Sequence, residues 1–452
     1  MQMSESCTLQ LHAKGRWNDV ASVSLLGPKA DGWKAKTYSG YTVDWAFAHA
    51  GASDAHALCV RRPVGLEPFQ EAHWPVYLID MLPQGFGRQE LLRRMGRSPT
   101  AGVAEDWTVL LAGAGNPIGN LRVKEAADWL EANAAGPLRG FTDDEVALRS
   151  DEFAEHLASH GLFVAGSSGI QGEWPKILFT RAEDGLLYLD HTLPDERAVQ
   201  HFIVKFGRGA DPQLATILRQ EAPYMAIARR LGLRVHAPLV LRRRALFIPR
   251  FDRTARGGVV TRLAQESIAT LTGMPGIDLV PSHDQVCAAL TRHCTHPQTE
   301  VLEYLKRDVA NLALLNKDNH ARNTAVQRDF AGRMALTPLY DFAPMYLHPD
   351  GIARRIRWED NDNGRPDWAR VVDRVCEWSV PALKPARKFT SKEKGAPAPA
   401  LARTALVAGL KAMEPALRQV AAEGEAMGLE PEVLNHLRPH ILAQADQLAA
   451  LA

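Results

Sequence analysis

The spacing of apolar and polar residues divides the chain into segments of different character. Between residues 163 and about 253, turn residues separate five strand-like runs: KILFTRA, LLYLDH, HFIVKFG, PLVLRRR and ALFIPRF. Their β-branched and aromatic residues favour strands, and one helical run, QLATILRQEAPYMAIARRLG, interrupts them. Beyond Gly273 apolar residues recur every three or four positions, as in TEVLEYLKRDVANLALLN, which is typical of amphipathic helices. The pattern predicts a β-rich lobe with one packed helix, followed by an α-rich lobe.

The first 140 residues mix strand-like runs, such as CTLQLHAKG, with helical runs, such as GRQELLRRMG, and predict a small α+β unit. The next run, FTDDEVALRSDEFAEHLASHG, has an acidic start typical of a helix and predicts a connecting helix that ends at Gly161. We therefore expect an α+β protein with a first unit at 1–140, a β-rich lobe at 141–255 and an α-helical lobe at 256–452. Residues 384–399, rich in Lys, Pro and Ala, are expected to form a mobile loop.

Length and composition agree with a folded protein of several domains. The 452 residues are too many for one small core, and 46% hydrophobic with 23% charged residues is ordinary for a folded chain. The 53 basic and 52 acidic side chains nearly cancel, so the formal charge is +1 and no overall field attracts nucleic acid or an anionic membrane. Any contact with DNA would therefore be local or pass through a partner.

The amino terminus and the cysteines predict a cytoplasmic protein without a membrane span. The first residues, MQMSESCTLQLHAKG, lack the basic, apolar and small-residue order of a signal peptide, and no run approaches the roughly 18 apolar residues of a spanning helix. The cysteines are odd in number and form no C-x-x-C pair, so neither a disulfide framework nor a zinc ribbon is expected. They are Cys7, Cys59, Cys287, Cys294 and Cys376.

The stretch LLNKDNHARNTAV is the strongest candidate for chemistry, because an apolar run ends there in a cluster of polar side chains. Asp318 stands five positions before Asn323. NTAVQ and MALTPLY are short strand candidates, and RDFAG between them supplies a turn, so the segment predicts an antiparallel hairpin. Because a hairpin brings its two ends together, Asp318, Asn323 and Asp341 are expected to meet at one edge of it.

Acidic side chains gathered at that edge require a positive partner. Two carboxylates about 4 Å apart repel each other by roughly 4 kcal/mol at an effective dielectric constant near 20. Oxygen ligands completed by water and phosphate are what Mg²⁺ accepts, and an acid that does not bind the metal can orient a hydroxyl nucleophile and take its proton. The same order of acid, amide and acid occurs in protein-kinase catalytic loops. For an isolated D-x-x-x-x-N pattern, however, capping of a helix end is the commoner explanation.

Together these residues resemble the HipA family of bacterial serine/threonine kinase toxins, and the resemblance spans most of the chain. Asp318, His320 and Asn323 match the catalytic loop D-x-H-x-x-N, in which His320 is expected to brace the loop by hydrogen bonding. LTPLYDFAP, which contains Asp341, is similar to the family's segment L-x-P-x-Y-D. DMLPQGFGR and LLAGAGNPIGNLRV resemble the amino-terminal subdomain, and RFDR, with Phe251, resembles the stretch that leads on from the adenine-binding hinge.

The resemblance implies a bilobal protein-kinase-like fold, with a β-rich N-lobe and an α-rich C-lobe preceded by a small α+β subdomain. It implies that Asp318 is the general base, that Asn323 and Asp341 hold Mg²⁺, and that Lys205 in HFIVKFG reaches the phosphates of ATP. A lysine suits that role because its compact ammonium meets phosphate as a point charge. Glu221, on the single helix, is the expected carboxylate partner of Lys205, by analogy with the lysine and glutamate pair of protein kinases.

The run VAGSSGIQGEWPKILF resembles the phosphate-covering loop of the family, which usually reads S-x-x-G-x-Q-x-K. Glycine lets the backbone approach phosphate closely, and successive amides supply hydrogen-bond donors. Gly166 stands where the family has a serine that is often autophosphorylated, and the hydroxyls of Ser167 and Ser168 lie close by in this nucleotide-binding loop. GEWP lengthens the gap before the lysine. The residues that match in type are Gly169, Gln171 and Lys176.

The resemblance implies an ATP- and Mg²⁺-dependent serine/threonine protein kinase that acts as the toxin of a toxin and antitoxin pair. The implied partners are a helix-turn-helix antitoxin of HipB type, DNA only indirectly through that antitoxin, and a protein substrate such as an aminoacyl-tRNA synthetase. Two alternatives stay open. The same machinery could phosphorylate a small molecule, or the protein could be a catalytically silent module that docks a DNA-binding antitoxin.

Three further motifs have simpler interpretations. GAGNPIG places glycines at 113, 115 and 119, but their last spacing is wrong for a dinucleotide-binding fingerprint. The arginine runs RRR at 242–244 and RRIR at 354–357 could bind phosphate, a protein or DNA. Strand-edge or solvated charges are the more ordinary interpretation of both runs.

Overall fold

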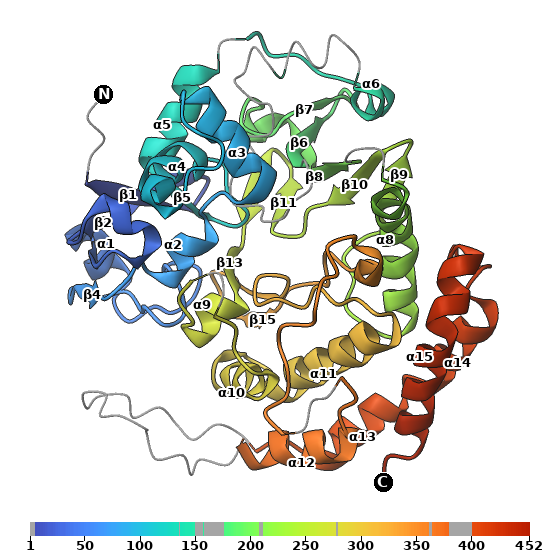
Figure 1. The fold of residues 1–452 in the computed structure, drawn as a ribbon. Coiled ribbons are helices and arrows are strands. Elements are labelled where there is room, and N and C mark those ends of the chain that lie inside the picture. The colour runs from blue at the N-terminus through green and yellow to red at the C-terminus, as the bar shows by residue number, and fades with distance from the viewer. Residues whose placement is uncertain are drawn as a thin grey trace.

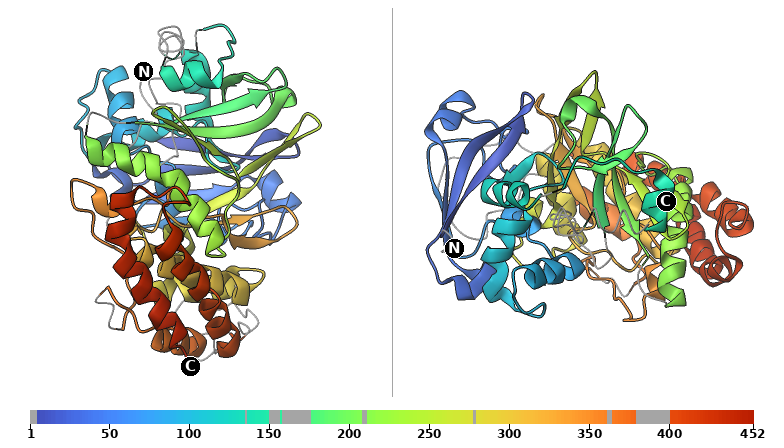
Figure 2. Two further views of the ribbon diagram at one scale, coloured as in Figure 1. Left: turned by 90° about the vertical axis from the view of Figure 1, so that its right-hand side faces the viewer. Right: turned by 90° about the horizontal axis from the view of Figure 1, so that it is seen from above.

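The computed structural model describes residues 5–134, 136–149, 157, 176–207, 211–276, 279–360, 364–378 and 400–452. The fold is α+β, and a small N-terminal unit (residues 5–134) lies beside a two-lobed body (Figure 1). The view from above in Figure 2 shows this unit alongside the rest of the chain. Within the described residues, no helix is both long and apolar enough to cross a lipid bilayer.

The N-terminal unit is built on an antiparallel five-stranded sheet with the order β4-β3-β2-β1-β5. Lys14 and Gly15 both have positive φ, of 53° and 74°, as the tight turn between β1 and β2 requires. Helix α5 packs against β1 and α4 packs against α5, and Trp107 of α4 meets Trp74 edge to face. The elements are β1 (Ser6–Ala13), β2 (Arg16–Leu25), η1 (Lys29–Lys34), β3 (Thr37–Tyr41), α1 (Val43–Ala48), β4 (Phe69–Glu71), α2 (Val76–Asp80), α3 (Gly85–Arg94), η2 (Val103–Glu105), α4 (Asp106–Gly113), β5 (Leu121–Val123) and α5 (Lys124–Asn133).

The second part, here called the sheet lobe, has all five predicted strands in one antiparallel sheet of order β7-β6-β8-β10-β9, together with the predicted helix α8. Asp211 caps α8 by accepting bonds from two backbone amides, and Pro212 follows at the helix start, where its missing N–H costs nothing. The predicted connecting helix begins with a capping box between Thr142 and Glu145. It ends at Leu148, because Arg149 has a φ of 52°, so the prediction of one helix that runs unbroken to Gly161 is wrong. Residues 150–156 and 158–161 lie outside the described residues. The elements are α6 (Asp143–Leu148), β6 (Lys176–Ala182), β7 (Leu187–Leu189), η4 (Asp195–Arg197), β8 (Ala198–Phe206), α8 (Pro212–Arg230), β9 (Val240–Arg242) and β10 (Ala245–Pro249).

The helical lobe follows, and its core forms around α11, whose apolar stripe includes Leu305 and Val309. Figure 2 shows the last two helices side by side on the outside of this lobe, as their mutual packing also indicates. Residues 384–399, the predicted mobile loop, lie outside the described residues. The elements are β11 (Arg253–Arg256), β12 (Val259–Arg262), β13 (Ala264–Ser267), α9 (Ile268–Thr272), α10 (His283–His293), α11 (Pro297–Ala313), β14 (Ala325–Arg328), β15 (Met334–Leu336), η5 (Met345–Leu347), α12 (Trp368–Trp378), α13 (Arg403–Lys411), α14 (Glu414–Glu423) and α15 (Pro431–Ala449).

The hairpin predicted after Asn323 is confirmed. Strands β14 and β15 pair antiparallel, with Val326 opposite Leu336, and β13 extends them into a three-stranded sheet. Asp329 closes the turn, because its carboxylate accepts hydrogen bonds from the backbone amides of Ala331 and Arg333. The hairpin therefore fixes the spacing between the loop before it (residues 314–324, here called the polar loop) and Asp341 after it.

The arginines of RRR at 242–244 are exposed, as the ordinary interpretation expects, and so are Arg355 and Arg357 in RRIR. Arg354 is the exception. Arg354, in RRIR, is not a solvated charge, because its guanidinium donates to both carboxylate oxygens of the buried Asp308, at 2.8 and 2.7 Å. The indole of Trp358 donates to the same carboxylate at 2.9 Å. These bonds hold the chain that follows Asp341 against α11, which a run of arginines in the sequence could not reveal.

A buried cluster of charges lies where the sheet lobe ends. Arg250 and Arg253 both contact the carboxylates of Asp190 and Asp252, at distances from 2.7 to 3.5 Å, and all four side chains are almost completely buried. Burial alone would raise the pKa of Asp252, but the two guanidiniums outweigh burial and hold this pKa well below its usual range. The cluster is therefore charged at neutral pH.

The same cluster shows the structural role of GAGNPIG, which joins the N-terminal unit to the end of the sheet lobe. The backbone carbonyl of Pro117 accepts bonds from Arg250 and Arg253, at 2.9 and 2.8 Å, and the amide of Gly119 donates to Asp252 at 2.8 Å. Gly119 has φ of 86°, and a side chain there would crowd Gln265 at 3.1 Å. The glycine lets the loop of the N-terminal unit lie directly on the end of the sheet lobe.

Asp252→Asn is expected to lower the free energy of unfolding by about 3–5 kcal/mol, because it leaves two buried guanidiniums without sufficient compensation. Asp144→Asn, at a side chain that is 72% exposed, is the control and should change stability little. Because the pKa of Asp252 is depressed, its contribution should be complete above the ordinary Asp pKa and lost only at lower pH. Denaturation in urea at pH 7 measures the difference, and equal stability of the two variants would contradict the assignment.

Candidate functional site

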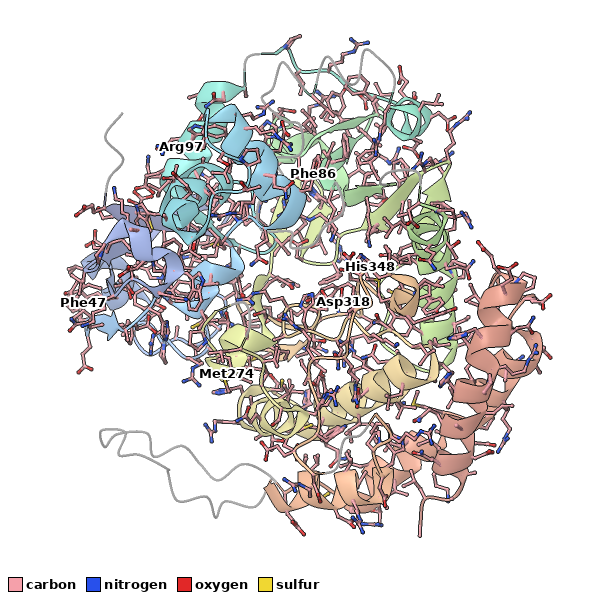
Figure 3. The ribbon with its side chains drawn as sticks, viewed as in Figure 1. Phe47, Phe86, Arg97, Met274, Asp318 and His348 are labelled. Carbon is pink, nitrogen blue, oxygen red and sulfur yellow. The ribbon has the colours of Figure 1, made fainter. Side chains whose placement is uncertain are left out.

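A cavity of about 210 Å³ lies where the N-terminal unit, the sheet lobe and the helical lobe meet. A smaller cavity adjoins the larger one, and Asn323, Tyr340 and Asp341 line both cavities. Asp318 lines the smaller cavity, and Figure 3 places it in the centre of the view, between the sheet lobe and α11. The cleft thus brings together most of the described residues that the sequence singled out. Those that line the larger cavity are Lys176, Lys205, Glu221, Phe251, Asn323 and Asp341.

Two lysines enter the cleft side by side from the sheet lobe. Lys176 and Lys205 are direct partners in the antiparallel pairing of β6 with β8, so their side chains project from the same face of the sheet. The ammonium of Lys205 donates to Glu221 Oε2 at 2.6 Å and to Asp341 Oδ1 at 2.9 Å. Lys176 Nζ lies 3.9 Å from Asp341 Oδ2. Asp341 therefore faces two positive charges, one on each oxygen.

Charge and burial set the protonation of this group. Burial would lower the pKa of Lys205, but Asp341 and Glu221 outweigh it and raise this pKa above its ordinary value. Burial would raise the pKa of Asp341, but Lys205 and Lys176 hold it well below its usual range. Lys205 and Glu221 are 3% and 1% exposed, whereas 25% of the Asp341 side chain is exposed. Asp341 is thus the charged oxygen ligand of this group that a molecule in the cleft can reach.

Helix α8 links the lysine to the polar loop. Glu221 and Tyr224 are three residues apart and lie on the same face of the helix. Glu221 binds Lys205, while the hydroxyl of Tyr224 donates to the backbone carbonyl of Leu314 at 3.0 Å. Leu314 follows the last residue of α11. One turn of α8 therefore holds both the sheet-borne lysine and the point where the polar loop begins.

The polar loop is held by bonds within itself. The Asn323 side chain donates to the backbone carbonyl of Asp318 at 2.8 Å. His320 Nδ1 accepts from the amide of Arg322 at 3.2 Å, and its Nε2 lies 3.6 Å from Asp318 Oδ1. Burial lowers the pKa of His320, so the ring is neutral near pH 7 and its proton lies on Nε2, toward the carboxylate. Burial raises the pKa of Asp318 and the Asp341 carboxylate adds to that effect, whereas His320 would oppose it only in its protonated form.

Asp341 has an unusual backbone conformation. Its φ of 53° lies in the left-handed region, which is costly for a residue other than glycine and occurs most often at functional sites. The preceding Tyr340 donates its hydroxyl to the backbone carbonyl of Arg322 at 2.9 Å. The structure therefore ties the turn at Asp341 to the polar loop that carries Asn323.

The donor set fits a hard divalent cation. The amide nitrogen of Asn323 is engaged by Asp318, so its oxygen is the atom that can act as a ligand, beside the carboxylate of Asp341. Among the described residues, no group of three His, Cys, Asp or Glu side chains could hold a metal ion by itself. A cation here would need further ligands from water or from phosphate, as Mg²⁺ commonly does.

The remaining predicted residues divide into two groups. Phe251 lines the larger cavity, with its ring 5.9 Å from Tyr340 and 6.2 Å from His236. The predicted phosphate-covering loop lies outside the described residues. Its members are Ser167, Ser168, Gly169 and Gln171.

Sequence reasoning missed the wall of the cleft that the N-terminal unit supplies. Tyr77, Asp80 and Ile118 line the larger cavity, and so does Arg322 in the polar loop. Arg322 could have been suspected from HARN, where it stands next to Asn323. Asp80 carries no comparable sequence signal, because the residues that it meets lie more than 180 positions later.

A family model described as "HipA-like C-terminal domain" matches residues 168–396, about half of the chain. The chain belongs to this HipA-like family. A curated relative, "Putative kinase Y4mE" of Sinorhizobium fredii, is 26% identical over 351 residues, which cover 70% of this chain and 77% of that protein.

The HipA-like fold extends beyond the family model. HipA of Shewanella oneidensis, solved in a complex with HipB and its operator DNA, matches with a TM-score of 0.62 at 18% identity, and the match covers 98% of each chain. At this identity the similarity concerns the fold, and it includes the N-terminal unit. The predicted bilobal kinase-like fold with a small N-terminal subdomain is therefore confirmed.

Lys205→Met is expected to lower the free energy of unfolding by about 3–5 kcal/mol, because Glu221 is left as a buried charge without its partner. Adding Glu221→Met should recover most of that loss, since an apolar pair of similar volume avoids the desolvation of both ions. Denaturation of the two single variants and the double variant, at one pH, measures the coupling. Losses that simply add would contradict a direct interaction between the two side chains.

Proposed function

We propose that this HipA-like protein is an ATP- and Mg²⁺-dependent serine/threonine protein kinase that acts as the toxin of a toxin and antitoxin pair. The observation that carries the proposal is the ammonium of Lys205 between Glu221 and Asp341, with Asn323 and Asp318 on the adjoining loop. Protein kinases use a lysine paired with a helix glutamate, a metal-binding acid, an amide and a catalytic acid for phosphoryl transfer. The family and the fold agree with this assignment.

Each residue has a chemical role in this proposal. Lys205 and Lys176 would bind and orient the phosphates of ATP from the sheet side of the cleft. Asn323 Oδ1 and the Asp341 carboxylate would hold Mg²⁺, which neutralises charge on the transferring phosphoryl group when it is bound. The carboxylate of Asp318 would orient the acceptor hydroxyl and take its proton.

The raised pKa of Asp318 suits a general base. A carboxylate with its ordinary pKa is a weak base, whereas burial makes this carboxylate more basic. Neutral His320, with a proton on Nε2, can steady the carboxylate without supplying a competing positive charge. Phe251 and its aromatic neighbours would contact the nucleobase.

The proposed partners follow the same assignment. The similar HipA from Shewanella oneidensis forms a complex with HipB and operator DNA. We propose that this chain likewise binds a helix-turn-helix antitoxin of HipB type and reaches DNA only through it, in agreement with its formal charge of +1. The acceptor would be a protein hydroxyl, with an aminoacyl-tRNA synthetase as the first substrate to test.

Asp318→Ala and Asp341→Ala are expected to lower the rate of phosphate transfer from labelled ATP by about 10²–10⁴-fold, through loss of the base and of a metal ligand respectively. EDTA should abolish transfer by the wild type, and added Mg²⁺ should restore it. Asp128→Ala, at a 57% exposed carboxylate on α5, is the control. Full transfer by both site variants would refute the assigned roles.

The acceptor class is tested by incubating the protein and labelled ATP with a complete bacterial extract. We expect label on protein, on a serine or threonine, in a band that is absent with Asp318→Ala. Label only on small molecules, with none on protein, would instead identify a small-molecule kinase. Binding of ATP with no transfer to either fraction would favour a silent docking module.

A further inference from the structure

The N-terminal unit reaches into the polar loop through one ion pair. Asp80, the last residue of α2, accepts a bond from Arg322 Nε to its Oδ1 at 3.0 Å. Only 17% of the Asp80 side chain and 7% of the Arg322 side chain are exposed. Removing one partner of an ion pair so shielded from solvent costs more than removing one partner of a surface pair.

The other oxygen of Asp80 is fixed by the helical lobe. Asp80 Oδ2 accepts from the hydroxyls of Ser267 and Thr270, both at 2.6 Å, and from the amide of Ser267 at 3.4 Å. Ser267 ends β13, Thr270 lies in α9, and Figure 1 shows α2 beside α9. The carboxylate is therefore aimed at Arg322 by hydroxyl groups, rather than being free to rotate.

Arg322 is an anchor of the polar loop. Its Nη2 donates to the backbone carbonyl of Gly276 at 3.0 Å, its amide donates to His320, and its carbonyl accepts from Tyr340. It is also the neighbour of Asn323. A shift of Arg322 would therefore move the imidazole of His320, the side chain of Asn323 and the turn that positions Asp341.

A second contact holds the hairpin that follows the loop. Arg328, 2% exposed in β14, pairs with Glu266 at 2.9 Å and donates to the backbone carbonyls of Ser53 and Ala57, at 2.9 and 3.2 Å. Glu266 in turn accepts from the backbone amide of Val60. The N-terminal unit therefore contacts the polar loop at Arg322 and the following strand, β14, at Arg328.

We propose that Asp80 is a positioning residue of the phosphoryl-transfer site and that the N-terminal unit sets the geometry of the catalytic loop through it. Both carboxylate oxygens of Asp80 are engaged by protein groups, so it acts through Arg322. The inference rests on the proposed function. It differs from a purely structural joint in one measurable way, because loss of the ion pair should slow the chemical step more than it lowers stability or the affinity for ATP.

Asp80→Asn removes the charge that binds Arg322 but keeps an oxygen for Ser267 and Thr270. It is expected to lower kcat by about 10–100-fold, as a small misplacement of reacting groups does, with the KM for ATP largely unchanged. Asp106→Asn is the matched control, because Asp106 is 3% exposed, pairs with Arg88 at 2.8 Å and lies in the same unit away from the loop. Both variants are compared by thermal denaturation, so that a general loss of folding is visible.

A double-mutant cycle tests the route through Arg322. Arg322→Gln alone should lower kcat to a similar degree, and the double variant should be no slower than the slower single variant, because both changes remove the same ion pair. Losses that multiply would contradict action through Arg322. A kcat for Asp80→Asn equal to that of Asp106→Asn would overturn the proposal.

Hydrogen exchange separates this inference from the proposed function. In Asp80→Asn, the backbone amides of residues 314–326 should exchange faster than in the wild type or Asp106→Asn, while those of α11 before the loop should not change. If the wild type transfers no phosphate, the proposed function fails, yet exchange still decides whether Asp80 orders the loop. Unchanged exchange in Asp80→Asn would overturn the positioning role whatever the activity.

Discussion

The site depends on a buried lysine ammonium shared by two carboxylates. Lys205 comes from β8, Glu221 from α8 and Asp341 from the turn after the β14 and β15 hairpin, so this contact joins the sheet lobe to the helical lobe. Removing such ions from water costs several kcal/mol for each, and an apolar trio of similar size could be as stable. Stability alone therefore does not account for these charges. Their accessible member, Asp341, faces the cleft, as a group that binds a ligand must.

Most of the surrounding fold serves to hold Asp341 and the polar loop in one arrangement. Asp341 has a left-handed backbone conformation, and the Tyr340 hydroxyl donates to the backbone carbonyl of Arg322, which ties that turn to the polar loop. Tyr224 of α8 fixes the other end of the loop at Leu314, and the ion pair between Arg354 and Asp308 holds the chain beyond it. The N-terminal unit adds a third wall, so the cleft is shaped by three parts of the chain rather than by two lobes.

The sequence predicted features that depend on local pattern or on order along the chain. The five strands, α8 and the hairpin follow from short-range alternation and turn residues, and the resemblance to a known family placed Lys205 and Asp341 in one cleft. The sequence could not predict contacts between residues that lie far apart along the chain and belong to common residue types. Nothing in the sequence distinguishes Asp80 from the other acidic residues, because only the folded chain places it beside Arg322. Arg354 of RRIR likewise looks like a solvated charge in the sequence, although it pairs with Asp308 in the structure. The glycine spacing of GAGNPIG argued against a dinucleotide-binding site, but it could not reveal the joint to Arg250.

The balance of charge in the cleft bears on what can enter it. Three carboxylates, from Glu221, Asp318 and Asp341, lie near the amines of Lys176 and Lys205. Burial raises the pKa of Glu221 and of Asp318 and lowers the pKa of Lys176. With all five groups ionised, the set carries one formal negative charge. A polyphosphate would add several more negative charges in a partly dehydrated space, where repulsion is poorly screened. In the proposed function, a divalent cation held by Asn323 and Asp341 would offset this repulsion. In the proposed function, binding of ATP would therefore depend on binding of Mg²⁺.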